Sequence, residues 1–328
     1  MRDYIGALSA LIVILIVLWT TQGGFMTVSN VQNILQSNAP LFLVSVGMTF
    51  VVISGGFDLS IGAMMAVAEE LLYLFINHGH LNALLATVLA VIACGAIGAL
   101  LNGVAIGVLR LNFFVTTLGS MILLEGVVFV ASGGNTNTIN SQWLQSMGNN
   151  AVGDVPIVTL ICAGLLVLAW FVLRATAFGR TVYCIGGNAE AARMSGISVS
   201  WTVFAVYGIS GMCGGLAGVV DAGRLSSATP TAGSTIALTS AAAVLLGGAS
   251  LAGGVGKLAG TTVGVLVLAL LSNGVNLFGV SAYYQDVVTG AVLLIAILLD
   301  QAHKSGLLSR VRRRGRQLTE PSPALADA

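Results

Sequence analysis

Charged side chains are scarce in this chain. Asp, Glu, Lys and Arg make up 8% of its 328 residues, whereas 56% of the residues are hydrophobic. A soluble domain carries roughly 25% charged residues, so this chain does not have enough charge to cover a surface in water. The scarcity excludes an ordinary soluble fold and predicts that lipid surrounds most of the protein. The 42 glycines agree with this prediction, because Gly is more frequent in membrane helices than in soluble ones.

Residues for metal or nucleophilic chemistry are also few. There are three His and four Cys, and no two Cys form a C-x-x-C pair. No His, Cys and carboxylate arrangement has the spacing of a metal site or a catalytic triad. The sequence therefore predicts no metal site and disfavours a membrane enzyme. The cysteines are expected to behave as small buried hydrophobes; they are Cys94, Cys162, Cys184 and Cys213.

The chain has no phosphate-binding loop of its own. Its nearest approach, Gly253 to Leu258, has Leu251 where the first Gly belongs and Leu258 where a Ser or Thr must bind magnesium. The chain is therefore expected to hydrolyse no ATP and to bind no cofactor. It also has no basic face interleaved with aromatic residues, which excludes nucleic acid as a partner.

Long apolar windows are present from end to end. A bilayer core needs roughly 20 apolar residues in a helix, and ten such windows predict an all-α, polytopic membrane helix bundle. The first follows Met1-Arg2-Asp3 without a cleavage site and is expected to remain as a membrane helix. The fourth is long enough to tilt or to include a loop turn. The windows are Tyr4–Thr20, Ala39–Ile53, Ile61–Ile76, Leu81–Leu109, Phe113–Ala131, Ile157–Leu173, Trp201–Asp221, Thr235–Ala249, Leu258–Phe278 and Tyr284–Leu299.

The basic residues predict the orientation of these crossings. With both termini in the cytoplasm and ten crossings, only Arg224 of the thirteen Lys and Arg residues lies outside. Short loops on the cytoplasmic side carry an excess of Lys and Arg, so this arrangement is favoured. Residues 1–300 then form the transmembrane domain, with a periplasmic loop from Ser132 to Pro156 and a cytoplasmic loop at about 174–200. Residues 301–328 are expected to form a basic, partly disordered cytoplasmic tail.

Two Gly-rich interruptions resemble each other. They are SGGFDLSIG at 54–62 and LGGASLAGG at 246–254, and both follow a crossing toward the cytoplasm. Paired interruptions in the two halves of a membrane protein are typical of a passage region, although Gly-Gly is also common in any Gly-rich chain. The spacings Gly103-x-x-x-Gly107, Gly211-x-x-x-Gly215 and Gly260-x-x-x-Gly264 predict close packing of helices within the chain.

Five ordered stretches resemble the ribose-type permease family of sugar ABC importers. They cover nearly the whole chain and are specific as a set. They read GMTFVVISGGFDLSIG at 47–62, NFFVTTLG at 112–119, FGRTVYCIGGNAEAARMSGI at 178–197, LGGASLAGG at 246–254, and SNGVNLFGV at 272–280.

The resemblance implies a function and a set of partners. Such permeases lie in the bacterial inner membrane, cross it several times and pair with a second permease, identical or different. They bind cytoplasmic ABC ATPase subunits, which hold ATP and Mg, and receive a monosaccharide from a periplasmic binding protein. The resemblance thus implies a permease subunit that translocates a monosaccharide or a sugar-like solute.

The cytoplasmic loop holds the candidate element for coupling to the ATPase. A Gly-rich turn precedes Asn188, which is a good N-cap for a short helix. Glu190 and Arg193 lie three residues apart, a spacing that can pair. A plain connecting loop is the alternative interpretation. The residues expected to couple to the ATPase are Gly179, Arg180, Gly186, Gly187, Asn188, Glu190, Arg193 and Gly196.

Several polar residues at membrane depth are candidates for the translocation pathway or its gate. Asp58 either caps the helix that begins near Ile61 or contacts the solute. Asn102, Asn273 and Asn276 either line a wet cavity or form hydrogen bonds between helices. Asn273 and Asn276 lie three residues apart and so share a helix face.

Glu69 and Glu70 depart from the family pattern, which has small or apolar residues there. Ionised carboxylates without partners are costly inside a membrane, so at least one is expected to face the translocation cavity or to be protonated. Ala237 and Thr239 stand where the family commonly has an acidic pair. A different function, that of a secondary transporter or facilitator working without an ATPase, is the alternative. It could use Glu69, Glu70, Glu125 or Asp286 as proton sites.

Overall fold

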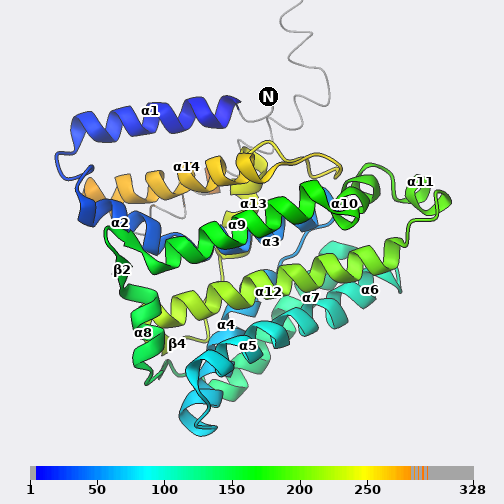
Figure 1. The fold of residues 1–328 in the computed structure, drawn as a ribbon, viewed down its shortest axis with the longest axis horizontal. Coiled ribbons are helices and arrows are strands. Elements are labelled where there is room, and N and C mark those ends of the chain that lie inside the picture. Colours follow the sequence, from blue (N-terminus) through cyan, green and yellow to red (C-terminus); the bar gives the residue numbers. More distant parts are fainter. Residues whose placement is uncertain (1–4, 282–283, 285–286, 288–289, 292–293, 295–328) are drawn as a thin grey trace, which may run out of the picture.

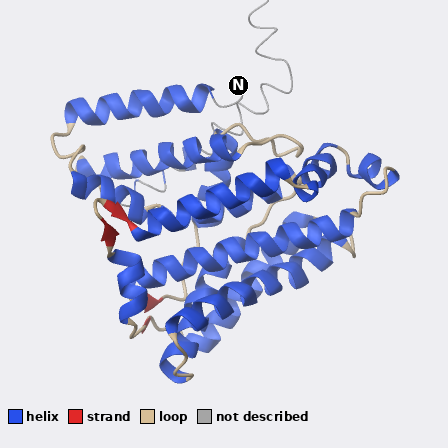
Figure 2. Ribbon diagram, viewed as in Figure 1, coloured by secondary structure: helices blue, strands red, loops and turns tan. Residues whose placement is uncertain are grey.

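The protein is a bundle of helices that run side by side in the computed structural model (Figure 1). The structure describes residues 5–281 together with 284, 287, 290, 291 and 294. The described residues contain two pairs of antiparallel strands, and each strand is two residues long (Figure 2). The prediction of an all-α membrane helix bundle is confirmed at this level.

Six helical stretches among the described residues are long and apolar enough to cross a membrane. They are α4 (Ser60–Tyr73) continued by the π-helical η1 (Leu74–His78), α5 (Ala83–Ile97) continued by the π-helical η2 (Gly98–Gly103) and α6 (Val104–Gly107), α7 (Phe113–Ser132), α9 (Ile157–Ala175), α12 (Val199–Leu225) and α14 (Leu258–Leu277). A seventh forms if α2 (Val28–Ser37) and α3 (Ala39–Ile53), bent by 43°, count as one span. Two shorter apolar helices are α1 (Ile5–Thr21) and α13 (Ile236–Leu246).

The predicted windows agree with most of these helices. Four of them, at 39–53, 113–131, 157–173 and 258–278, match observed helices within two residues at each end. The fourth window contains one continuous helix, Ala83–Gly107, whose middle widens into π-helical geometry. The window extends past this helix at both ends and includes the turn at Val108 and Leu109. The eighth window contains only the 11 residues of α13, since the turn at Gly247 ends that helix. The tenth window and the tail at 301–328 lie mostly or wholly outside the described residues.

Three short amphipathic helices were not predicted. They are α2, α8 (Gln142–Asn149) and α10 (Ala177–Gly187). The Gly-rich turn expected before Asn188 is in fact α10, because Val182 and Ile185 form a buried face and Thr176 caps its first turn. The strands are β1 (Asn137–Thr138), which pairs with β4 (Ser227–Ala228), and β2 (Ala151–Val152), which pairs with β3 (Val155–Pro156).

Helix α12 lies at the centre of the bundle, packed against α3, α4, α5 and η2. Its glycines allow this close packing. A Cβ atom added at Gly214 would lie 2.6 Å from the Ile61 carbonyl oxygen, and one at Gly211 would overlap the Cys94 carbonyl oxygen. The helix packing predicted from the small-residue spacings is therefore confirmed within this chain, where van der Waals contact between backbones holds membrane helices together.

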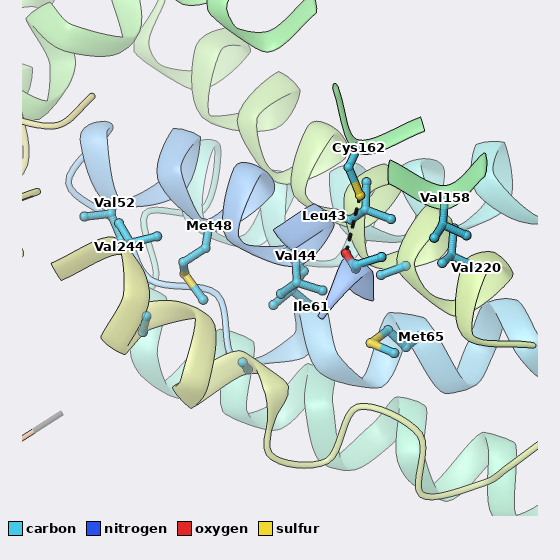
Figure 3. Close-up of a cluster of buried hydrophobic side chains, with 14 of the residues drawn as sticks. Leu43, Val44, Met48, Val52, Ile61, Met65, Val158, Cys162, Val220 and Val244 are labelled. Atoms are coloured by element: carbon cyan, nitrogen blue, oxygen red, sulfur yellow. Dashed lines mark hydrogen bonds between the residues drawn. The ribbon is translucent and has the colours of Figure 1, made fainter. Parts of the chain in front are cut away.

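A buried hydrophobic cluster joins α3, α4, α9, α12 and α13 (Figure 3). The cluster includes Leu43, Val44 and Met48 of α3, Ile61 of α4 and Val244 of α13. Cys162 of α9 faces the same cluster, and its Sγ donates a hydrogen bond of 3.8 Å to the Ala39 carbonyl oxygen. Cys94, Cys162 and Cys213 are buried, as predicted, whereas Cys184 is exposed on α10.

The two long loops lie at opposite ends of the bundle. Helices α10 and α11 (Ala189–Met194) occupy one end, and α8 with the small strand pair β2–β3 occupies the other (Figure 1). At the α8 end, Asn149 Nδ2 donates to the carbonyl oxygens of Gly223 and Arg224 at the end of α12. The loops predicted to face opposite sides of the membrane are thus separated by the length of the helices.

Candidate functional site

Helices α10 and α11 project from one end of the bundle, and a side chain caps the N-terminus of each (Figure 1). Thr176 Oγ1 accepts a hydrogen bond of 3.1 Å from the Gly179 amide and begins α10. Asn188 Oδ1 accepts one of 2.9 Å from the Ala191 amide and begins α11, so the predicted N-cap is confirmed. Capping by an Asn side chain satisfies a backbone donor that the first helical turn leaves free.

The surface of α11 is exposed and carries both a charged pair and an apolar side chain. Arg193 Nη1 and Glu190 Oε2 form the expected ion pair at 2.9 Å, with side chains 41% and 69% exposed. Met194 at the end of α11 is 84% exposed. An exposed ion pair contributes little to stability, about 0–1 kcal/mol. The pair therefore orders the surface of α11 more than it stabilises the fold.

The backbone of α10 contacts two other segments of the bundle directly. Gly186 lies against the Ile53 carbonyl oxygen at the end of α3 and against the Gly254 amide between α13 and α14. Tyr183 Oη donates a hydrogen bond of 2.9 Å to the Gly256 carbonyl oxygen. Burial raises the pKa of the Tyr183 phenol above its ordinary value, which is itself well above neutral, so the hydroxyl keeps its proton. The sequence did not predict Gly254 and Gly256 as partners of α10, because no local pattern reveals contacts between positions about seventy residues apart.

Asp58 is the buried centre of a polar network at the break between α3 and α4. It is 1% exposed. Its Oδ1 accepts from the Ser60 amide at 2.9 Å and from Ser60 Oγ at 2.7 Å, and its Oδ2 accepts from Ser210 Oγ of α12 at 2.6 Å. The first bond is the helix-start cap that the sequence predicted. A buried carboxylate requires such donors, because burying a charge without them is costly.

The network continues through Asn102. Asn102 Nδ2 donates to Ser60 Oγ at 2.7 Å, and Asn102 Oδ1 accepts from Ser120 Oγ of α7 at 2.6 Å. Asn102 lies in η2, so one amide joins η2 to both α4 and α7. Of the two predicted roles for this amide, the structure shows hydrogen bonding between helices. Ser60, Ser120 and Ser210 were missed, because a lone Ser in an apolar helix has no sequence signal of its partner.

Asn273 also bonds across helices. Its side-chain amide and that of Asn30 exchange two hydrogen bonds of 3.2 and 2.9 Å, joining α14 to α2. Asn276 lies one turn further along α14. These contacts place the Asn273 amide beside the bent pair α2–α3, whereas the Asn276 side chain is exposed.

Glu69 and Glu70 lie inside the bundle on α4, 1% and 4% exposed. Glu69 Oε2 accepts a hydrogen bond of 2.8 Å from the Thr229 amide, just after β4. The Oε1 atoms of both carboxyls have no hydrogen-bond partner among the described residues. On α13, Ala237 is buried and Thr239 Oγ1 donates to the Thr235 carbonyl oxygen. No group of three or more His, Cys, Asp or Glu in the described part is placed to hold a metal ion.

Comparison with known proteins gives the family. Residues 30–297 match the family of permease components of the branched-chain amino acid transport system. The chain belongs to this permease family. It is 40% identical over 298 residues to the ribose import permease protein RbsC of Escherichia coli strain K12, covering 90% of this chain and 92% of that protein.

Two other relatives are also named as permeases for pentose sugars. The permease is 38% identical to the ribose import permease protein RbsC of Bacillus subtilis strain 168 over 299 residues, with 90% and 92% of the two chains covered. It is 31% identical to the xylose transport system permease protein XylH of Escherichia coli strain K12 over 348 aligned positions, with 87% and 88% covered. No solved structure matches it. The predicted resemblance to ribose-type ABC permeases is confirmed, and the protein is a multi-pass inner-membrane permease subunit.

Proposed function

We propose that this permease translocates a monosaccharide, or a sugar-like solute, across the bacterial inner membrane as part of an ATP-driven importer. The observation that carries the proposal is similarity along the whole chain to permeases named for ribose and xylose. The family model is described by branched-chain amino acid transport. However, the relatives that align with about nine-tenths of the chain are named for pentoses, and these decide the substrate class.

The proposed assembly supplies what this chain lacks. A cytoplasmic ABC ATPase subunit binds ATP and Mg, and this chain binds no cofactor itself. A second permease subunit, identical or different, completes the passage, and a periplasmic binding protein delivers the sugar. The permease crosses the membrane ten times, with both termini in the cytoplasm. This places the α10–α11 end inside and the α8 end outside.

In the proposed mechanism, α11 docks on the ATPase. Closure of the ATPase on ATP moves α11, and α10 carries that movement to the ends of α3 and α13. An element that transmits force needs a fixed shape, which the two caps and the Glu190–Arg193 pair provide. The proposed ATPase contacts are the exposed residues of the predicted set, namely Arg180, Gly187, Asn188, Glu190, Arg193 and Gly196. Gly179 is buried and Gly186 lies against the bundle, so these two predicted residues do not face the ATPase.

The proposed passage lies beside the polar groups inside the bundle. Asp58 and Asn102 fix the backbone at the break between α3 and α4. Asn273 lines the side formed by α14, and Asn276 lies one turn beyond it on the exposed surface. Glu69 and Glu70 keep buried carboxyl oxygens available to a solute. Hydroxyl groups of a sugar are natural donors to such oxygens, since hydrogen bonds to charged groups contribute about 1.5–3 kcal/mol.

Uptake by purified components tests the proposal. The permease is reconstituted into liposomes with its ATPase and its loaded binding protein, and entry of labelled ribose and xylose is measured with ATP or with a non-hydrolysable analogue. Uptake is expected only when ATPase, binding protein and ATP are all present. Sugar flux through the permease alone, driven by a proton gradient, would instead establish the secondary transporter.

Substitution of Glu69 tests the passage. Glu69→Gln keeps an oxygen that can accept from the Thr229 amide but removes the charge. If the carboxylate contacts the solute, loss of one charge-assisted hydrogen bond is expected to lower uptake by about tenfold, the equivalent of about 1.4 kcal/mol. Glu125→Gln on α7 is the matched control. Wild-type uptake by Glu69→Gln and by Glu70→Gln, at equal expression, would remove both carboxyls from the passage.

A further inference from the structure

Three Gly-Gly pairs that are far apart in the sequence meet at the α10 end of the bundle. They are Gly55-Gly56 after α3, Gly186-Gly187 at the end of α10, and Gly253-Gly254 between α13 and α14. A Cβ atom on Gly253 would lie 2.6 Å from the Gly186 carbonyl oxygen and 2.7 Å from the Gly55 Cα. A Cβ on Gly186 would overlap the Ile53 carbonyl oxygen and the Gly254 amide. The three backbones are therefore in direct contact, with no side chain between them.

Hydrogen bonds fix this contact on two sides. The Gly254 amide donates to the Ile53 carbonyl oxygen at 2.8 Å, joining the α13–α14 turn to the end of α3. Tyr183 Oη donates to the Gly256 carbonyl oxygen at 2.9 Å, joining α10 to the same turn. The segment from 53 to 56, the end of α10 and the turn at 253–256 thus form one connected unit.

Backbone conformation is a second reason for glycine here. Gly55, Gly253 and Gly254 have φ angles of 84°, 83° and 71°. A side chain in this left-handed region is unfavourable, whereas Gly adopts it readily. Gly186 has no such conformation, since it lies within α10. Close approach alone therefore explains the glycine at position 186.

The unit joins the α10–α11 segment to both Gly-rich interruptions of the chain. From Gly55 and Gly56 the backbone leads to Asp58, whose carboxylate accepts from Ser210 of α12. From Gly254 it leads to the start of α14 at Leu258. Side chains can absorb a displacement by changing rotamer, but backbones in direct contact pass it on, since packed protein transmits strain.

We propose that five of these glycines, Gly55, Gly186, Gly187, Gly253 and Gly254, form a backbone joint that passes movement of α11 to the α3–α4 break and the α13–α14 turn together. Gly186 is the positioning residue of the joint, because it touches both partners. This proposal rests on the proposed function, in which α11 receives the movement of an ATPase. It adds the route by which movement of α11 reaches the α3–α4 break and the α13–α14 turn at the same time.

Gly186→Ala tests the joint in the assembled transporter. Gly164→Ala on α9 is the matched control, because the same substitution in another helix meets no atom within 4 Å. Alanine favours a helix over glycine by up to about 1 kcal/mol, so neither change weakens its own helix. Co-purification of the ATPase measures assembly. The ratio of ATPase activity with loaded binding protein to activity without it measures coupling, and sugar uptake is followed in parallel.

The joint predicts that Gly186→Ala still assembles with the ATPase while its stimulation ratio and its uptake fall by about tenfold, a coupling loss of about 1.4 kcal/mol. Gly164→Ala behaves as the wild type. A wild-type stimulation ratio in Gly186→Ala would overturn the joint.

If Gly186→Ala does not assemble, Tyr183→Phe decides, since it removes only the hydroxyl that bonds to Gly256. A lowered stimulation ratio in assembled Tyr183→Phe supports the joint, and an unchanged ratio overturns it. Failure of the wild-type permease to recruit or stimulate any ATPase would refute the proposed function instead, which separates the two claims.

Discussion

At the scale of single residues, the polar groups in this bundle form hydrogen bonds that cross between helices. Asp58, Ser60, Asn102, Ser120 and Ser210 connect α4, η2, α7 and α12 through bonds of 2.6–2.9 Å. Measured bonds of this kind between membrane helices average roughly 0.6 kcal/mol. A buried acceptor that serves several donors is worth more, since its loss leaves each of them unsatisfied.

Asp58→Ala is therefore expected to destabilise the permease. The substitution leaves the Ser60 amide and the Ser60 and Ser210 hydroxyls without their acceptor, so the free energy of unfolding should fall by roughly 1.5–3 kcal/mol. Thermal unfolding of the purified protein in detergent measures this change. Asp154→Ala is the control, because Asp154 is exposed and its contact with Gln32 uses only the backbone oxygen. Equal melting temperatures for Asp58→Ala and the wild type would mean that the hydrogen-bond network does not stabilise the break between α3 and α4.

At the scale of elements, the caps of α10 and α11 give the projecting end of the bundle its shape. The six residues of α11 are too few to be stable as an isolated helix, so this helix depends on its cap and on its attachment to the bundle. Asn188 supplies the cap through a bond of 2.9 Å.

Asn188→Ala is expected to impair coupling. Loss of an Asn cap costs about 1 kcal/mol, which is enough to fray α11 and weaken its docking on the ATPase. Co-purification of the ATPase and uptake should both fall. Asn82→Ala removes an equivalent cap from α5, where Asn82 Oδ1 accepts from the Leu84 amide at 2.9 Å, and should lower stability without loss of coupling. Equal uptake defects in the two variants would show that α11 has no specific role in coupling to the ATPase.

The elements also show what the sequence can predict. Helices such as α3 and α7 were predicted within a residue or so because the hydrophobic thickness of a membrane fixes their length and composition. α2, α8 and α10 were missed because an apolar window of about 20 residues cannot detect a helix of 8–11 residues with only one apolar face. A signal was present in α10, where Phe178, Val182 and Ile185 recur at helical spacing after the cap residue Thr176.

At the scale of the whole molecule, the sequence predicted that the two long loops are separated, but not which distant segments contact each other. Charge distribution placed the 132–156 and 174–200 loops on opposite sides, and the structure places them at opposite ends. Sequence similarity between 54–62 and 246–254 predicted two related breaks. That Gly55 and Gly253 touch the same residue of α10 follows only from tertiary packing, which no local pattern contains.

The proposed mechanism requires that an ATPase docks on α11 and not on the other end of the bundle. The most direct measurement places a photo-cross-linking amino acid at Met194, which is 84% exposed on α11, and at Trp143, which is 43% exposed on α8. After illumination of membranes that contain the full transporter, docking on α11 predicts an adduct with the ATPase from position 194 and none from position 143. An ATPase adduct from position 143, with none from position 194, would contradict it.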